Sequence, residues 1–152
     1  MDWTYFLPCL WAFLACIGFC AFLNLRSIIG MLICCFGGAL GWLTYLVALL
    51  AGAGDLLGYF AAALVISAYA EIMARVRKCP VTGYLLISFF PLVPGAGIYR
   101  TMEYLVQGNT EMFLNQGMYT LGLAGSLALG VLVMSSAVRV IFIIRKSGRK
   151  HA

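Results

Sequence analysis

The chain has 152 residues, of which 64% are hydrophobic and only 10% are charged, and its net charge is +5. Soluble domains are about half apolar and about one quarter charged, so this composition excludes a soluble catalytic domain and indicates an integral membrane protein. At about 20 apolar residues per crossing, the length allows five or six membrane spans and little else. We therefore expect an all-α fold: a polytopic helical membrane protein in which residues 1–152 form a single integral membrane domain.

The apolar segments, taken in chain order, predict about five transmembrane helices. The predicted spans cover residues 3–23, 28–50, 56–74, 81–107 and 118–144. Small residues recur at a spacing of four in two of them, as Gly37 and Gly41 in the second and as Gly122, Ser126 and Gly130 in the fifth. This spacing lets another helix approach closely. The longest polar connection is expected from Gly108 to Gly117.

The charges at the ends of these segments predict their orientation. Basic residues follow the first, third and fifth spans: Arg26, the run from Arg75 to Lys78, and the C-terminal Arg145, Lys146, Arg149 and Lys150. Acidic residues mark the opposite ends: Asp2, Asp55 and Glu111. The positive-inside rule then predicts an outside N-terminus and a cytoplasmic C-terminus. Because the basic residues lie at span ends rather than along one surface with interleaved aromatic residues, we expect no nucleic-acid partner.

The cysteines and the histidine do not form a pattern typical of a metal or catalytic site. The six cysteines have no C-x-x-C spacing and no companion histidine, so we expect small buried hydrophobic side chains. The single histidine, His151, is the penultimate residue. No Ser/His or paired-Asp arrangement occurs in the spans either. We therefore expect no enzyme, no catalytic residues, no metal and no cofactor.

The fourth segment is interrupted by the stretch FFPLVPGAGIY, residues 89–99. Pro91 and Pro94 lack a backbone N–H, and Gly95 and Gly97 adopt conformations that other residues resist, so the helix should break here. An unwound segment at membrane depth persists only where protein or a water-filled cavity covers it. A half-helix starting near Gly95 would point its free N–H groups into the protein, which suits a carboxylate. The alternative is a proline kink that serves packing alone.

Charged side chains within the third and fourth segments are further candidates. Glu71 shares a helix face with Ala63 and Ser67, which should point to the bundle interior because a carboxylate near lipid is costly. The alternative for Glu71 is an ion pair with Arg75, four residues on. Arg100 should extend to the membrane surface, pair with Glu103, or face a polar cavity.

An odd number of spans has a further consequence. A preceding five-helix unit with a cytoplasmic start would end outside and meet this chain in inverted orientation. We therefore expect this chain to be one half of an inverted-topology transporter, with a site near the midplane between the two halves.

The run AEIMARVRKCPVTGYLLISFFPLVPGAGIYRTMEYLVQGN resembles the characteristic region of the threonine/serine exporter family, specifically its short five-helix subunit. The resemblance extends upstream through FLNLRSIIGMLICCFGGALGWLTYL and downstream through the fifth span. Its most specific parts are Glu71 to Arg75, Pro80, and PLVPG at Pro91 to Gly95.

This resemblance implies export of small amino acids such as threonine and serine across the bacterial cytoplasmic membrane, driven by the proton gradient. It also implies a partner, a second five-helix membrane subunit with a soluble N-terminal domain. Family members are linked to dicarboxylate export as well, especially of succinate. Arg100 stands where relatives often carry an uncharged aromatic residue, and a cation there could favour a second carboxylate.

The predicted substrate site combines the broken helix with nearby polar residues: Glu71, Pro91, Pro94, Gly95, Gly97, Tyr99 and Arg100. In this hypothesis the half-helix binds the substrate carboxylate, Glu71 is the proton or amine partner, and Tyr99 and Arg100 shape the cavity. The alternatives are a dicarboxylate exporter subunit and a membrane scaffold that transports nothing and stabilises a partner.

Overall fold

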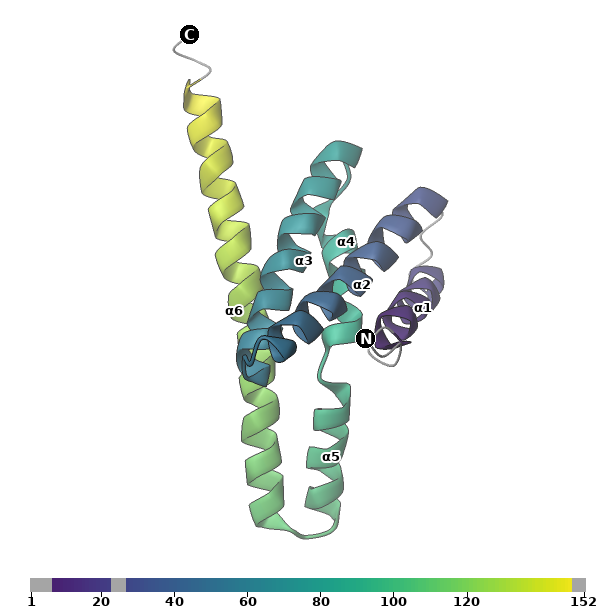
Figure 1. Ribbon diagram of the computed structural model, residues 1–152, viewed down its shortest axis with the longest axis vertical. Helices are drawn as coiled ribbons and strands as arrows, with labels where there is room; N and C mark the ends of the chain where they lie inside the picture. The colour runs from purple at the N-terminus through teal and green to yellow at the C-terminus, as the bar shows by residue number, and fades with distance from the viewer. Residues whose placement is uncertain (1–6, 23–26, 149–152) are drawn as a thin grey trace.

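The computed structural model describes residues 7–22 and 27–148, and all the regular secondary structure there is helical (Figure 1). They are α1 (Leu7–Phe22), α2 (Ile28–Leu50), α3 (Asp55–Arg77), α4 (Val81–Phe89), the short 3-10 helix η2 (Phe90–Leu92), α5 (Gly95–Val106) and α6 (Thr110–Gly148). The predicted all-α, polytopic membrane fold is confirmed. Several residues used in the predictions lie outside the described ranges: Asp2, Arg26, Arg149, Lys150, His151 and the first residues of the first span.

Among the described residues, three helices are long and apolar enough to cross a membrane: α2, α3 and α6. The pair Val81–Leu92 and Gly95–Val106 is bent by 55° and becomes a fourth crossing if it is one broken span. The described part of α1 has 16 residues, or about 24 Å of helix, which is short of a hydrocarbon core of about 30 Å. The five predicted crossings therefore stay a prediction, with three of them matched by a full-length helix.

Local signals fix the ends of α2 and α3. The side-chain oxygen of Ser27 accepts a hydrogen bond from the Gly30 amide at 3.3 Å, which caps the start of α2. The turn before α3 contains Gly52 at a φ of +84°, a conformation that suits glycine. Asp55 then opens α3, where its negative charge is favourable beside the helix N-terminus.

The predicted polar connection from Gly108 to Gly117 is wrong, because α6 begins at Thr110. Gly108 has a φ of +73° and reverses the chain after α5. The Asn109 side chain then accepts a hydrogen bond from the Met112 amide at 3.2 Å and caps α6. The connection is thus a tight turn, and α6 is 39 residues long instead of the 27 expected from residues 118–144.

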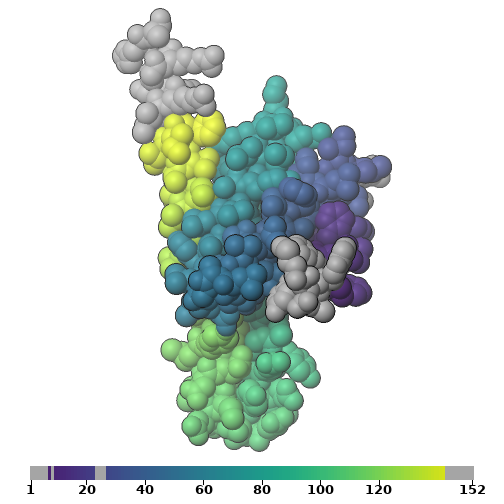
Figure 2. All heavy atoms as spheres, in the orientation of Figure 1, coloured from purple at the N-terminus to yellow at the C-terminus, as the bar shows by residue number. Residues whose placement is uncertain are grey.

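The helices form a bundle from which one hairpin projects (Figures 1 and 2). α2 packs against α1, α3 and α4, and α3 packs against α6. α5 pairs with the first turns of α6, and this α5–α6 hairpin extends past the turn between α2 and α3. At 1.5 Å per residue α6 is about 58 Å long, roughly twice a hydrocarbon core. Part of α6 must therefore lie outside that core.

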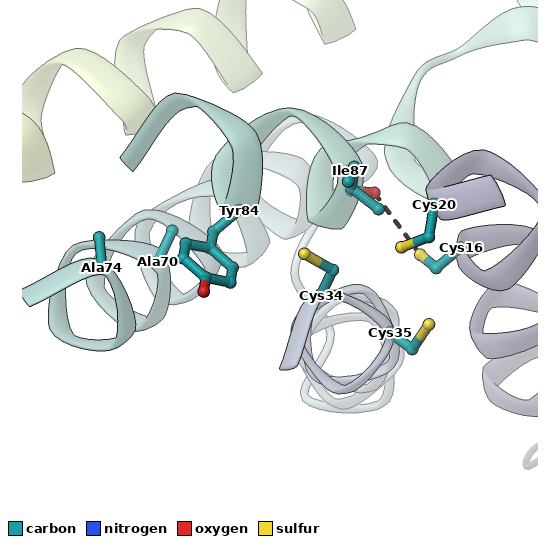
Figure 3. Close-up of a cluster of buried hydrophobic side chains, with 8 residues drawn as sticks. All are labelled: Cys16, Cys20, Cys34, Cys35, Ala70, Ala74, Tyr84 and Ile87. Atoms are coloured by element: carbon teal, nitrogen blue, oxygen red, sulfur yellow. Dashed lines mark hydrogen bonds between the residues drawn. The ribbon is translucent and has the colours of Figure 1, made fainter. Parts of the chain in front are cut away.

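Four cysteines occupy the interface between α1 and α2 (Figure 3). Cys16 and Cys20 from α1 and Cys34 and Cys35 from α2 are fully buried. The Cys16 thiol lies 3.5 Å from the backbone carbonyl oxygen of Ile87 in α4. The expectation of small buried side chains is confirmed for these four; by contrast, Cys79 is exposed.

The small residues do let helices approach closely. A side chain at Gly41 would meet Ile66 of α3 and Leu92 of η2, and one at Gly37 would meet Ser88 of α4. On α6, Gly130 lies against α3 so closely that an added Cβ would stand 2.9 Å from the Phe60 carbonyl oxygen. Backbone cannot move aside as a flexible side chain can, so Gly130 fixes the distance between α3 and α6.

We predict that Gly130→Ala separates α3 from α6 and lowers the free energy of unfolding by about 1–3 kcal/mol, the usual cost of overpacking. Gly125→Ala on the same helix is the control, because an added Cβ there meets nothing within 4 Å. Thermal unfolding of the purified protein in detergent measures both. Equal melting temperatures for the two variants would contradict the packing described here.

Candidate functional site

The chain breaks between η2 and α5, as the prolines predict. Pro91 lies in the single turn of η2, and Val93 then adopts an extended conformation with a ψ of 126°. Pro94 precedes the first residue of α5, Gly95. Neither proline can donate a backbone hydrogen bond. The series of backbone hydrogen bonds along the helix therefore stops at η2 and starts again beyond Pro94. The predicted half-helix beginning near Gly95 is confirmed.

The first side of the break is embedded in the bundle. Leu92 is buried and packs with Ile66, the central residue of α3. Pro91 lies close to Gly38 of α2 and helps to line a cavity of about 340 Å³ with Trp11, Ala12, Ala15 and Trp42. The break therefore begins at the level of the middle of α3.

The second side of the break rests on α6 alone. An added Cβ at Gly97 would lie 2.6 Å from the hydroxyl oxygen of Thr120 and 3.0 Å from its methyl carbon. One turn later, Gly117 approaches the Thr101 methyl group. Two contacts at this spacing dock one face of α5 against α6, and no other described helix packs along α5.

The rest of α5 is open. This helix is strongly amphipathic and has no buried residue. Gly95 and Ala96 at its N-terminus are exposed, Tyr99 is 70% exposed, and Arg100 is exposed beside it. The expectation that the N-terminal N–H groups point into the protein is thus not met within residues 7–22 and 27–148, because the helix bundle there does not extend over the start of α5. Any cover for this N-terminus must come from outside the described residues.

Arg100 and Glu103 do not form the predicted pair. Glu103 instead accepts a hydrogen bond from the Gln107 side chain at 3.3 Å. Arg100 makes no ion pair with any residue that the structure describes. An exposed arginine on the open face of α5 remains available to an anion, one turn from the N-terminus of that helix.

Glu71 does form the ion pair with Arg75, with 2.9 Å between the guanidinium nitrogen and the carboxylate oxygen. The guanidinium also lies over the Phe142 ring of α6, 3.4 Å from the ring centre. The predicted interior face is confirmed for Ala63 and Ser67, which are fully buried, and the Glu71 side chain on the same face is mostly covered, with 14% of it exposed.

The structure does not bring Glu71 to the broken helix. Glu71 is tied through Arg75 to Phe142, whereas Gly97 contacts Thr120. These two α6 residues are 22 positions apart, or about 33 Å along the helix. A small substrate at the N-terminus of α5 cannot reach both. Of the predicted site, the structure groups Pro91, Pro94, Gly95, Gly97, Tyr99 and Arg100 and leaves Glu71 at the far end of α3.

One acidic residue near the break was missed as a site residue. Asp55 was predicted only as a marker of the outer end of α3, yet its carboxylate accepts hydrogen bonds from Tyr45 of α2, at 3.2 Å, and from Tyr119 of α6. Tyr45 is ten positions before Asp55, on the other side of the turn that joins α2 to α3. Such a contact is expected between two helices that form a hairpin. Tyr119 is 64 positions away, and nothing in the sequence indicates that contact.

We predict that Gly97→Ala weakens the docking of α5 on α6 and lowers the free energy of unfolding by about 1–3 kcal/mol. Thr120 cannot turn aside easily, because its hydroxyl donates a hydrogen bond to the Gln116 carbonyl at 2.7 Å and its χ1 angle is restricted. Thermal unfolding measures the loss.

Two variants serve as controls for that measurement. Gly95→Ala should be tolerated, since an added Cβ there meets nothing within 4 Å. Thr120→Ala removes both crowding atoms and should restore stability in the double variant with Gly97→Ala. Failure of the double variant to recover would contradict the contact.

Comparison with known proteins identifies the family of this chain. The family model described as "Threonine/Serine exporter, ThrE" matches residues 8–137. No curated protein and no solved structure matches. The matched region includes α2 to α5 complete, with the proline break, and most of α6. The chain therefore belongs to the threonine/serine exporter family of membrane transport proteins.

Proposed function

We propose that this chain is one subunit of a proton-coupled secondary transporter that exports small amino acids such as threonine and serine across the bacterial cytoplasmic membrane. The observation that carries the proposal is the half-helix α5, which restarts at Gly95 after the break and leaves its N-terminus exposed. The Gly95 amide donates to the Val93 carbonyl at 2.7 Å, which leaves the amides of Ala96 and Gly97 unpaired among the described residues. Unpaired N–H groups at a helix N-terminus bind anions. Every amino acid substrate offers a carboxylate for such a site.

In this proposal the substrate carboxylate binds beside Gly95 and Gly97, while Tyr99 and Arg100 line the cavity. All four residues lie within the first two turns of α5. Pro91 and Pro94 keep the helix open at this point by removing two backbone donors. Glu71 stays a separate prediction, because its ion pair with Arg75 places it near the other end of α6.

The open apolar face of α5 is the reason to propose a partner chain. Ile98, Tyr99, Met102, Leu105 and Val106 are each at least half exposed, and only α6 packs along this helix. A second five-helix membrane subunit with a soluble N-terminal domain, in inverted orientation, would cover this face and enclose the substrate. We place the N-terminus outside and the C-terminus in the cytoplasm, following the basic residues at the ends of α3 and α6.

Arg100 favours a second candidate, a dicarboxylate exporter subunit. It has no carboxylate partner among the described residues and stands one turn beyond the N-terminus of α5. A cation at that place would attract the second carboxylate of a substrate such as succinate. Arg100→Gln should then reduce succinate transport more than threonine transport.

Efflux from preloaded cells tests these functions. Cells express this chain, its five-helix partner, or both, and release of threonine, serine and succinate is measured. We expect export only from the pair, because neither chain alone encloses the N-terminus of α5. Export of succinate alone would favour the dicarboxylate candidate. A pair that assembles in the membrane but moves none of the three would contradict the proposal and favour a scaffold that does not transport.

A further inference from the structure

A second cavity lies at the end of the bundle where α2 and α4 begin and α3 ends. Its volume is about 330 Å³. Its walls include parts of three helix ends: Ser27 and Gly30 at the start of α2, Arg77 at the end of α3, and Thr82 and Gly83 in the first turn of α4. No described residue of η2, α5 or α6 lines it, so this cavity is separate from the proposed substrate site.

The two helix N-termini at this cavity favour an anion. No side chain caps α4, and the backbone amides of residues 81–83 have no hydrogen-bond partner among the described residues. Unpaired amides at a helix N-terminus bind anions. At the start of α2 the Ser27 hydroxyl accepts a hydrogen bond from the Gly30 amide, and a hydroxyl that accepts still has its own proton to donate.

α3 brings its C-terminus to the same cavity, and terminal carbonyl groups disfavour an anion. Here they are largely occupied. The amides of Lys78 and Cys79 donate to carbonyls in the last turn of α3, and the Cys79 thiol donates to the Arg77 carbonyl. The Arg77 side chain forms no ion pair with any described residue, and no described acidic residue lines the cavity. The charge at this place is therefore positive.

A buried tyrosine is an independent sign of a ligand. Tyr84 of α4 is only 7% exposed and lines the cavity. Its hydroxyl oxygen lies beside the first turn of α2, 3.9 Å from a Cβ added at Gly30. Arg77 and Cys79 lie near this hydroxyl, yet among the described residues none has the geometry of a hydrogen bond with it. A buried hydroxyl normally has a partner, so Tyr84 and Arg77 can hold one anion between them.

The cavity lies at the depth of lipid headgroups. α2 and α3 are apolar spans of 23 residues each, or about 34 Å of helix, which matches a hydrocarbon core of about 30 Å. The start of α2 and the end of α3 therefore lie at one surface of that core. The side chains next to Ser27 and Arg77 in sequence are apolar and more than half exposed, as lipid-facing residues are: Ile28, Ile29 and Val76.

We propose that this cavity binds a phosphate group, and that the headgroup of an anionic phospholipid in the cytoplasmic leaflet supplies it. The unpaired amides of α4 and the hydroxyls of Ser27 and Tyr84 donate hydrogen bonds to the phosphate oxygens, and Arg77 pairs with the charge. The bound lipid then joins the first turn of α4 to the ends of α2 and α3. The proposal uses the orientation given under the proposed function and does not depend on the transported substrate.

Native mass spectrometry of the full-length chain in a neutral detergent tests the proposal. Phosphatidylglycerol and phosphatidylcholine are titrated in parallel. We expect phosphatidylglycerol to bind more tightly, because phosphatidylcholine adds a cation for which the cavity offers no described acidic partner. Glycerol 3-phosphate is added as a soluble competitor, and it distinguishes a lipid from a free phosphate ester.

Variants locate the binding site. Arg77→Gln should weaken phosphatidylglycerol binding at least about tenfold and Tyr84→Phe at least about threefold, since each removes a donor to a charged group. Lys78→Asn is the matched control: it removes the same charge one residue away, Lys78 does not line the cavity, and Asn tolerates the φ of 52° found there. If Tyr84→Phe does not fold, Gly83→Leu replaces it. A Cβ at Gly83 meets nothing within 4 Å, so the leucine side chain should fit and obstruct the cavity.

The possible failures are distinguishable. Equal binding of the two lipids, or an equal loss in Arg77→Gln and Lys78→Asn, overturns the proposal, because the attraction is then to the basic surface as a whole. Unchanged binding in Tyr84→Phe and Gly83→Leu overturns it as well. Displacement of the lipid by an equal concentration of glycerol 3-phosphate upholds the phosphate site and overturns the lipid as its source. A failure of export by the pair would refute the proposed function and leave the lipid site standing.

Discussion

The two missing backbone donors at Pro91 and Pro94 constrain the rest of this structure. A membrane segment that cannot complete its own hydrogen-bond ladder must have its unpaired groups covered by protein or by water in a cavity. The bundle of α1 to α4 covers the first half of the break, where Leu92 is buried against α3. It does not cover the second half, because Gly95 and Ala96 are exposed. The result is an asymmetry, with one side of the break packed and one side open, on which the proposed site between two chains rests.

The long helix α6 connects the separate parts of the molecule. Its first turns support α5 through Thr120 and Gly117, and its middle packs on α3 at Gly130. Its later part meets the Arg75 guanidinium through Phe142. Because these contacts lie on one continuous helix, α6 holds α5, the middle of α3 and the Arg75 guanidinium in fixed relative positions. The junction at Asp55 lies next to the α5 contact, whereas the Glu71–Arg75 pair lies more than twenty residues further along.

Most of the fold could be predicted from local sequence, and most of the failures concern contacts between distant residues. Prolines and glycines act on their own backbone, so the break and the start of α5 at Gly95 were predictable. The start of α6 was not, because the residues from Thr110 to Gly117 are polar in composition, and the Asn109 cap overrides that composition. The ion pair of Glu71 was one of two alternatives, both based on spacing within one helix. The hydrogen bond from Tyr119 to Asp55 depends on how α3 and α6 pack, and no spacing encodes it.

Protection of a single thiol by substrate tests whether the substrate binds at the N-terminus of α5. Cys9, which is partly exposed, and Cys79, which is exposed, are both replaced by serine, and the four buried cysteines of α1 and α2 should not react. In this background a cysteine replaces Ala96 at the N-terminus of α5. Gln107→Cys, at the far end of α5, is the control. Labelling by a water-soluble thiol reagent is followed in the complete exporter, with and without substrate. Our account predicts that a transported substrate slows labelling at position 96 and not at position 107. Equal labelling at position 96 with and without substrate, in an exporter that transports it, would contradict the account.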